Sequence, residues 1–438
     1  GTWWGNLQTH LGKANKAAKN TRGWQIPVAP GERSTLSGSY SAVHPQFAYQ
    51  KFQNGLGVSS KSLGLFWYVM GRAFPGLFNG SEKLNAIELT KRMAWKSGGI
   101  AFKDDNQNAV SLGITLNQDD NDYEGLIRFP NLSSIAAAHY ATHNPQKIQE
   151  YWNDLDGEIR NEFNAESHDL FFSRTRRPFH VKRADRALKA NTDYDKGYNG
   201  VMFSAKWLAE DMNLNSSETT ELRSLIDKTQ KKHFGDNNPA DWWVLVLGDG
   251  DGMGDYVNGR KLKSYQNYII EDLVNREGID NETWESLKRT RKRMGPATHV
   301  GLNRALLDFS NRIVNYITEE RCCGKVIYSG GDDVMAALPL ADLGKYLISL
   351  RSAWCGGIDP EGEFNSSGGY WQWNNENPNQ TPRPDDIPQR PLFTMGEEAT
   401  MSLGIVIAHK SVPLPTVLEK IWDAEKERAK KLIGGKIS

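Results

Sequence analysis

Cysteine is scarce in this chain of 438 residues. The three cysteines are Cys322, Cys323 and Cys355, an odd number that includes an adjacent pair, and neighbours in sequence cannot easily bridge to each other. No Cys-x-x-Cys pair occurs, so the ligand spacing of a structural zinc site is absent. These absences indicate a reducing compartment, and we expect the protein to be cytoplasmic.

Long apolar runs and an excess of charge of one sign are also missing. No apolar stretch approaches the roughly 18–20 residues needed to cross a bilayer, so no membrane partner is predicted. Lys+Arg and Asp+Glu both number 53, which makes the formal net charge zero and leaves no overall field that attracts nucleic acid. Any RNA contact must therefore be local, at basic clusters such as 174–177 and 288–293, although most such runs are solvated faces.

What the chain does contain is a short turn that carries two carboxylates. Residues 329–333 read Ser-Gly-Gly-Asp-Asp and lie between the apolar runs 326–328 and 334–338. This pattern predicts two strands joined by a Gly-Gly turn. Adjacent carboxylates at a rigid tip are suitable ligands for a hard divalent cation. Gly-Gly-Asp-Asp is also a good turn sequence for an exposed hairpin, so taken alone it favours neither interpretation.

A second group of carboxylates follows a predicted strand further upstream. The apolar run 242–247 leads directly into Gly-Asp-Gly-Asp-Gly-Met-Gly at 248–254. Four glycines within this segment let the backbone approach a ligand closely and direct N–H groups toward phosphate oxygens. The two carboxylate segments are far apart in sequence, but a sheet can place them side by side.

The order of the predicted elements connects the two segments. Apolar residues at helical spacing over 302–317 predict a helix between the first strand and the hairpin. A second helix is predicted over 341–354, and a last strand over 400–408. The order βαββαβ predicts an α+β fold with a ferredoxin-like sheet and helices on one face.

A sheet of this kind with a carboxylate after its first strand and a Gly-Gly-Asp-Asp hairpin resembles the palm of nucleotide polymerases and cyclases. The pair of motifs most resembles the large, palm-containing subunit of type III CRISPR effector complexes, of the Cmr kind. Other matching stretches are Pro30 to Thr35, Ser41 to Pro45, Glu82 to Arg92, Phe129 to Ala136 and Ala399 to His409.

The resemblance implies a metal-dependent nucleotidyltransferase that converts ATP to cyclic oligoadenylates after a guide CRISPR RNA pairs with a target RNA. The implied partners are the other subunits of the complex, both RNAs and ATP. Joining a 3′-hydroxyl to an α-phosphate is chemistry that two Mg²⁺ or Mn²⁺ ions roughly 3.5–4 Å apart can support. The predicted catalytic residues and metal ligands are Asp249, Asp332 and Asp333.

Predicted nucleotide contacts surround these carboxylates. Asp251 either binds metal directly or orients the glycine-rich turn. Lys430 lies where the resemblance implies a phosphate-binding lysine, whereas its surroundings in the alternating charges of 425–431 are equally typical of a solvated helix. The full set is Gly250, Asp251, Gly252, Met253, Gly254, Ser329, Gly330, Gly331 and Lys430.

We expect two regions in the chain. Residues 1–236 form a mixed, largely helical region with remnants of a degenerate palm, and residues 237–438 form the catalytic palm. A long insertion at 356–398, rich in Asn, Pro, Gly and Gln, predicts a loop that faces a partner or moves.

Two other functions stay open. A cyclic dinucleotide synthase outside CRISPR usually carries Gly-Gly-Asp-Glu-Phe, and Asp333-Val334 in place of Glu-Phe argues against it. A scaffold that anchors the guide RNA is the non-enzymatic alternative. The intact carboxylates at 249, 332 and 333 speak against a degenerate site.

Overall fold

The computed structural model of the chain describes residues 3–21, 31–45, 58–73, 78, 80–94, 101–103, 109–111, 131–163, 181–193, 198, 200–212, 214–269, 281–367, 369–379 and 381–432. The basic cluster predicted at 174–177 lies outside these residues. Among the described residues, no helix combines the length and the apolar character needed to cross a bilayer.

The first half of the chain is mainly helical, as predicted. Its helices are α1 (Trp3–Asn20), α2 (Ser60–Ala73), α3 (Ala86–Ala94), α5 (Leu132–His143), α6 (Pro145–Phe163), α7 (Lys182–Asn191), the 3₁₀ turn η2 (Gly200–Phe203), α8 (Ala205–Met212) and α9 (Ser216–Phe234). A small hairpin pairs β1 (Ala101–Lys103) with β2 (Ala109–Ser111).

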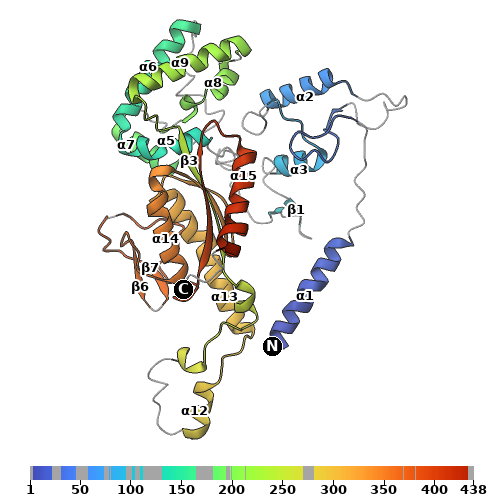
Figure 1. Ribbon diagram of the computed structural model, residues 1–438, viewed down its shortest axis with the longest axis vertical. Helices are drawn as coiled ribbons and strands as arrows, with labels where there is room; N and C mark the ends of the chain where they lie inside the picture. Colours follow the sequence, from blue (N-terminus) through green and yellow to red (C-terminus); the bar gives the residue numbers. More distant parts are fainter. Residues whose placement is uncertain are drawn as a thin grey trace.

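Helices α5 to α9 lie together at one end of the molecule (Figure 1). Their shared core buries large side chains such as Trp152, Leu155 and Leu222. Helix α9 starts in a capping box, in which the Asn215 side chain accepts from the Glu218 N–H and the Glu218 carboxylate accepts from the Asn215 N–H. Two N–H groups that the helix itself cannot pair are satisfied in this way.

Four antiparallel strands form the palm sheet. The strands are β3 (Trp242–Gly250), β4 (Lys325–Gly330), β5 (Asp333–Pro339) and β9 (Met401–His409), in the order β4-β5-β3-β9. This is the order that a βαββαβ chain gives, so the predicted ferredoxin-like α+β palm is confirmed. Strand β3 lies in the middle, which places its carboxyl end between the ends of β5 and β9.

The two connecting helices of the palm cover one face of the sheet. The crossover starts as α13 (Pro296–Asp308) and continues as two π-helical segments, η4 (Phe309–Ile313) and η5 (Tyr316–Arg321). The 3₁₀ turn η6 (Leu340–Asp342) and helix α14 (Leu343–Cys355) follow the hairpin. Three shorter helical segments, α10 (Met253–Val257), η3 (Tyr265–Asn267) and α12 (Asn281–Arg289), precede the crossover.

The opposite face of the sheet is covered as well, by two helices outside the predicted βαββαβ unit. Val244 and Val246 of β3 pack into the core beneath α13 and α14, whereas Trp243, Leu245 and Leu247 point the other way. Because successive side chains of a strand alternate, an unbroken apolar strand has two faces to cover. Helix α5 and helix α15 (Leu414–Trp422) cover the second face.

The insertion also differs from the predicted loop. It forms a small sheet of β6 (Phe364–Ser367), β7 (Tyr370–Trp373) and β8 (Leu392–Phe393). Trp371 and Trp373, two residues apart, lie on one face of β7 and are buried in the palm core. Aromatic burial therefore attaches the insertion to the palm.

A buried arginine reinforces this attachment. Arg321 at the end of η5 donates to Asp359 at 2.7 Å, to Glu363 at 2.8 Å and to Ser349 of α14 at 2.9 Å. All three charged side chains are nearly inaccessible to solvent. Each buried charge in this cluster thus has a partner of opposite sign, which buried ions require.

Candidate active site

The ends of two palm strands bring the three predicted carboxylates together. Asp249 is the penultimate residue of β3, and Asp333 is the first residue of β5. The register pairs Gly248 of β3 with Val334 of β5. Asp249 and Asp333 are the next residues on these two antiparallel strands, so they lie side by side at the same end of the sheet. Gly331, with φ at 67°, forms the turn that presents Asp332 beside them.

The electrostatics of these carboxylates indicates crowded negative charge. Burial, a hydrogen bond with Asp249 and the charges of Asp249 and Asp332 raise the pKa of Asp333 to about 6, although Lys430 acts in the opposite direction. Burial and the charge of Asp249 also raise the pKa of Asp332. Close carboxylates usually share one proton, which lowers the repulsion between them. A divalent cation lowers this repulsion further, because it carries two positive charges.

Lys430 reaches this group from the C-terminal end of the chain. It lies on η7 (Asp423–Leu432), a π-helical segment that continues α15 and packs along β9. Its ammonium forms an ion pair with Asp249 and lies 2.8 Å from Oε1 of Glu425. Burial alone would lower the pKa of Lys430, but its hydrogen bonds to the two carboxylates outweigh this effect and raise it. Lys430 is therefore a permanent positive charge beside Asp249.

Asp251 is hydrogen-bonded to β9 and to the residue that precedes β9. Its Oδ1 accepts a hydrogen bond of 2.6 Å from Ser402 of β9, and its backbone N–H donates to the Thr400 carbonyl. Lys261 donates to the Asp251 carbonyl oxygen. These contacts fasten the glycine-rich turn to β9, which corresponds to the orienting role considered for Asp251.

The glycines of both motifs allow close approach of the backbone. A Cβ on Gly250 would lie 2.9 Å from Cβ of Asp332 and 2.8 Å from the Trp354 ring. A Cβ on Gly330 would lie 2.6 Å from the Tyr328 hydroxyl. Gly252, with φ at 67°, precedes α10 in the left-handed conformation. Gly254 has no neighbour within 4 Å of an added Cβ.

Two further predicted nucleotide contacts, Ser329 and Met253, also have structural partners. Ser329 donates to the carbonyl of Ser310 at 2.8 Å and so ties the hairpin to η4. Met253 packs against the palm core. The roles proposed for these residues and for the glycines stay predictions, because their placement alone does not define a ligand.

Sequence reasoning missed Glu425 and Trp354. The Trp354 indole N–H donates to the Thr400 carbonyl at 3.0 Å and the ring lies under Gly250, so it supports the floor of the site. Glu425 lies five positions before Lys430, a spacing that an α-helical pattern does not place on one face. The π-helix joins residues five apart by its i→i+5 hydrogen bonds, and no simple signal in the sequence indicates it.

The carboxylate group fits divalent cations by its chemistry. Three oxygen-bearing side chains converge, and the raised pKa values of Asp332 and Asp333 show negative charge that the protein leaves incompletely compensated. Hard cations such as Mg²⁺ prefer such oxygen ligands. Asp249 is held by Lys430 in this arrangement, and the three side chains do not form a closed cage of ligands.

A different trio is more compact but is explained by hydrogen bonds. In the part of the chain that the structure describes, only His139, Cys323 and Asp342 bring three potential ligand atoms within 4.8 Å of one another. Asp342 accepts from the Cys323 N–H at 2.7 Å and lies 2.8 Å from Nδ1 of His139. Burial raises the pKa of the Cys323 thiol to about 12, so it stays protonated. This trio joins α5 to the palm.

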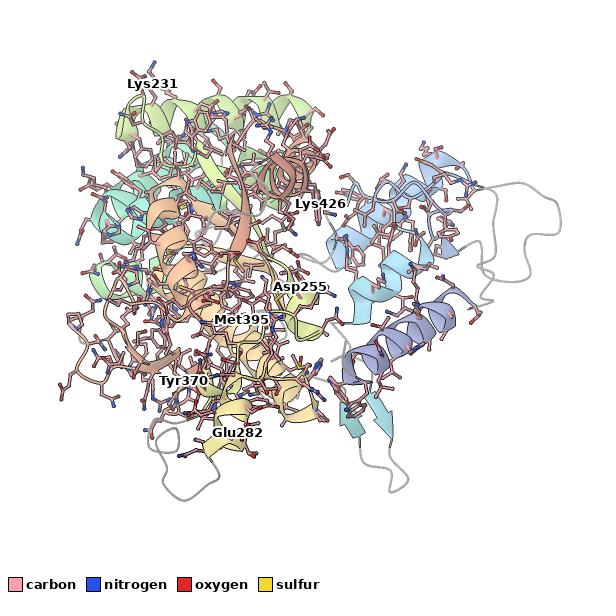
Figure 2. The ribbon with its side chains drawn as sticks, turned by 60° about the horizontal axis from the view of Figure 1, so that its bottom comes forward. Lys231, Asp255, Glu282, Tyr370, Met395 and Lys426 are labelled. Atoms are coloured by element: carbon pink, nitrogen blue, oxygen red, sulfur yellow. The ribbon has the colours of Figure 1, made fainter. Side chains whose placement is uncertain are left out.

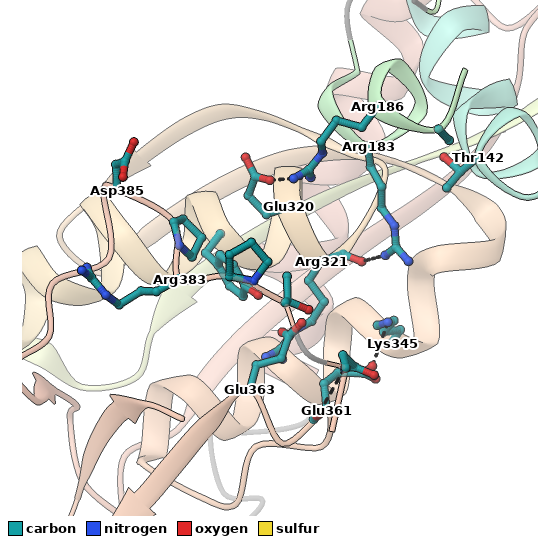
Figure 3. A pocket seen from close by; sticks show the side chains of 16 residues that line it. Thr142, Arg183, Arg186, Glu320, Arg321, Lys345, Glu361, Glu363, Arg383 and Asp385 are labelled. Atoms are coloured by element: carbon teal, nitrogen blue, oxygen red, sulfur yellow. Dashed lines mark hydrogen bonds and ion pairs between the residues drawn. The ribbon is translucent and has the colours of Figure 1, made fainter. Parts of the chain in front are cut away.

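The described residues of the palm and its surroundings form cavities, two of which are considered for ligand binding. One, of about 630 Å³, lies between α7, η5 and the insertion and is lined by several charged side chains (Figure 3). Several of its cations are paired with carboxylates, for example Arg186 with Glu320 and Lys345 with Glu361, whereas Arg183 donates to the backbone carbonyl of Arg321 (Figure 3). The other, of about 920 Å³, is an open cleft lined by residues that include Tyr256 of α10 and Ala399. Neither the glycine-rich turn 248–254 nor any of the three carboxylates lines this cleft.

Comparisons with known proteins agree with this geometry. Residues 244–378 match the family model described as Cas10/Cmr2, second palm domain. CRISPR system Cmr subunit Cmr2 of Pyrococcus furiosus is 25% identical over 222 residues, which are 51% of this chain and 21% of that relative. The structure described as the apo state of type III-B Cmr-beta is similar with a TM-score of 0.51 at 16% identity, over 97% of this chain and 46% of the other. The chain thus spans less than half of the proteins it matches.

Proposed function

We propose that this chain is the palm subunit of a type III, Cmr-kind RNA-guided effector complex, because residues 244–378 match the family model of the second palm domain of Cas10/Cmr2 and the chain is similar to a Cmr2 subunit. We further propose that its palm joins ATP molecules into cyclic oligoadenylates. In this proposal its partners are the other subunits, a guide CRISPR RNA and a target RNA whose binding activates the palm.

One observation carries the enzymatic part of the proposal. Asp249 comes from β3 and Asp332 and Asp333 come from the β4–β5 hairpin, and folding places them at one end of the sheet together with Lys430. A hairpin that served only as a turn would have no reason to place its two carboxylates beside Asp249, whose charge raises the pKa of both. Such an arrangement costs folding stability, and active sites are where proteins accept that cost.

The residues of the chain support the reaction in distinct ways. The three carboxylates would hold two Mg²⁺ or Mn²⁺ ions, which supply charge neutralisation at the α-phosphate and acidify the attacking 3′-hydroxyl. Lys430 provides a cation for the leaving pyrophosphate. Gly250 and Gly252 give the backbone room beside the phosphates, and Gly250 in particular leaves space for both Asp332 and the Trp354 ring.

The test is nucleotide turnover by the assembled complex. We would incubate it with labelled ATP or GTP and Mg²⁺ or Mn²⁺, with and without matching target RNA, and separate the products by chromatography. We expect oligoadenylate only with ATP and target RNA. Asp332→Ala/Asp333→Ala should lower the rate by about 10²-fold or more, because metal stabilisation contributes several kcal/mol.

A matched control is Asp236→Ala, which removes an exposed carboxylate before the start of β3, at the opposite end from the site. This variant should keep the wild-type rate. No nucleotide product from an intact complex with bound target RNA would refute the enzymatic proposal and leave the guide-anchoring scaffold. A GTP product would refute the assignment of ATP.

A further inference from the structure

Glu425 is a carboxylate that the reaction above does not use, although it is part of the same site. Its side chain is only 2% exposed, at the start of η7. Gly404 of β9 allows η7 to come this close, since a Cβ there would lie 2.8 Å from the Glu425 backbone nitrogen. Glu425 therefore lies on the side of η7 that packs against the sheet, beside the ammonium of Lys430.

The Oε1 atom of Glu425 is buried and already paired with Lys430. It lies 2.8 Å from Nζ of Lys430, but the direction of this contact is poor for a hydrogen bond, and the same ammonium also pairs with Asp249. A buried carboxylate oxygen is stabilised most by a well-directed donor. Movement of the ammonium from Asp249 toward Glu425 would improve the direction of this contact.

Lys430 and a divalent cation compete for the carboxylate of Asp249. An ammonium that occupies a carboxylate oxygen both blocks that oxygen and repels an approaching dication. Because Lys430 contacts Oδ2 of Asp249, metal binding at this carboxylate is favoured when Lys430 moves away. The lysine side chain has several rotatable bonds and a second carboxylate within reach, so it can move without leaving the site.

We propose that Glu425 is a positioning residue that receives Lys430 when Asp249 binds metal, so that Lys430 acts as a built-in competitor of the metal in the resting palm. The inference rests on the proposed function in one respect, that this palm binds divalent cations at Asp249. Glu425 then keeps the ammonium beside the site, where a triphosphate would meet it. The i→i+5 register of η7 is what places the two residues on one side.

The test measures Mn²⁺ affinity, which needs no nucleotide turnover. The intact protein is freed of metal and titrated with Mn²⁺, and free Mn²⁺ is followed by electron paramagnetic resonance. Lys430→Met should tighten binding roughly 3- to 10-fold, because the competitor is lost. Lys426→Met is the matched control. Lys426 is on the same segment and points outward over the Trp422 ring, so its loss should change affinity by less than about 2-fold (Figure 2).

The role of Glu425 is isolated by a double-mutant cycle. Glu425→Gln should weaken Mn²⁺ binding in the otherwise wild-type protein, since Lys430 then stays on Asp249. It should have no effect in the Lys430→Met background. Glu425→Asp keeps the negative charge, but its shorter side chain places the carboxylate further from Lys430. This variant should therefore weaken Mn²⁺ binding as Glu425→Gln does.

Three results would overturn the inference. Equal weakening by Glu425→Gln in both backgrounds, with no effect of Glu425→Asp, would mean that Glu425 acts through its own charge. Unchanged affinity in Lys430→Met would mean that the lysine does not compete. Absence of Mn²⁺ binding in every variant would instead refute the proposed function, together with this inference.

Discussion

Replacement of Asp333 by asparagine should stabilise the metal-free protein at neutral and alkaline pH. The wild-type site forces Asp333 against Asp249 and Asp332, and the pKa of Asp333 is raised from 3.8 to about 6. The folded state therefore binds a proton more tightly than the unfolded state. The free energy of unfolding falls as the pH rises from about 4 to about 6, and the loss persists above that range. An asparagine amide carries no charge and can donate to Asp249 at every pH.

The size of the effect follows from this shift. A pKa shift of about two units corresponds to roughly 3 kcal/mol of the free energy of unfolding if the group is fully shielded from solvent. Asp333 is only partly buried, and screening by solvent reduces the expected gain to about 1 kcal/mol. For a chain of this size such a gain raises the melting temperature by about 1–3 °C at about pH 8. Near pH 4 the difference between variant and wild type should be close to zero.

The assay is thermal unfolding in a chelating buffer over this pH range. The chelator is needed because a bound cation would stabilise the wild-type carboxylates. The wild type would then have a higher melting temperature than Asp333→Asn. The matched control is Asp236→Asn, which also removes one carboxylate but outside the site, and it should leave the pH profile unchanged. A lower melting temperature of Asp333→Asn at about pH 8, or a gain independent of pH, would refute the idea that crowded charge destabilises this site.

Three other changes test separate parts of the structure. Arg321→Met leaves Asp359 and Glu363 buried without their cation, so it should cost about 3–5 kcal/mol and lower the melting temperature; an unchanged temperature would contradict the buried cluster. Gly250→Ala pushes Asp332 and Trp354 aside and should abolish most nucleotide turnover while the fold, checked by circular dichroism, survives. Asn215→Ala removes the cap of α9 and should cost about 1 kcal/mol in denaturant unfolding, with turnover at the wild-type level as the internal control.

The palm could be predicted from the sequence because its signals are local. The apolar run before Asp249, the Gly-Gly turn before Asp332 and the helical spacing over 302–317 each follow from a simple period or turn preference. Their order along the chain then fixes the strand order, and the strand order brings the carboxylates together. Lys430 required the family resemblance, since its charge pattern alone indicates a solvated helix.

What was missed depends on long-range packing or on irregular backbone. Glu425 meets Lys430 only because η7 is π-helical, and Gly404 makes room for it from a different element. The insertion looked like a loop because its polar and glycine-rich composition outweighed the alternation at Trp371 and Trp373. The boundary predicted between 236 and 237 stays a prediction.

Helix α5 takes part in two hydrophobic cores. Ile135 and Ala136 pack on the palm sheet, whereas Ala137, Ala138 and Ala141 face the helices α6 to α9. Neither core can lose this helix without exposing apolar surface in the other, so the helical cluster and the palm form one cooperative unit. We therefore expect calorimetry to record a single unfolding transition for the helical cluster and the palm. Strand β3, which carries Asp249, would not unfold separately from the helices that pack on it.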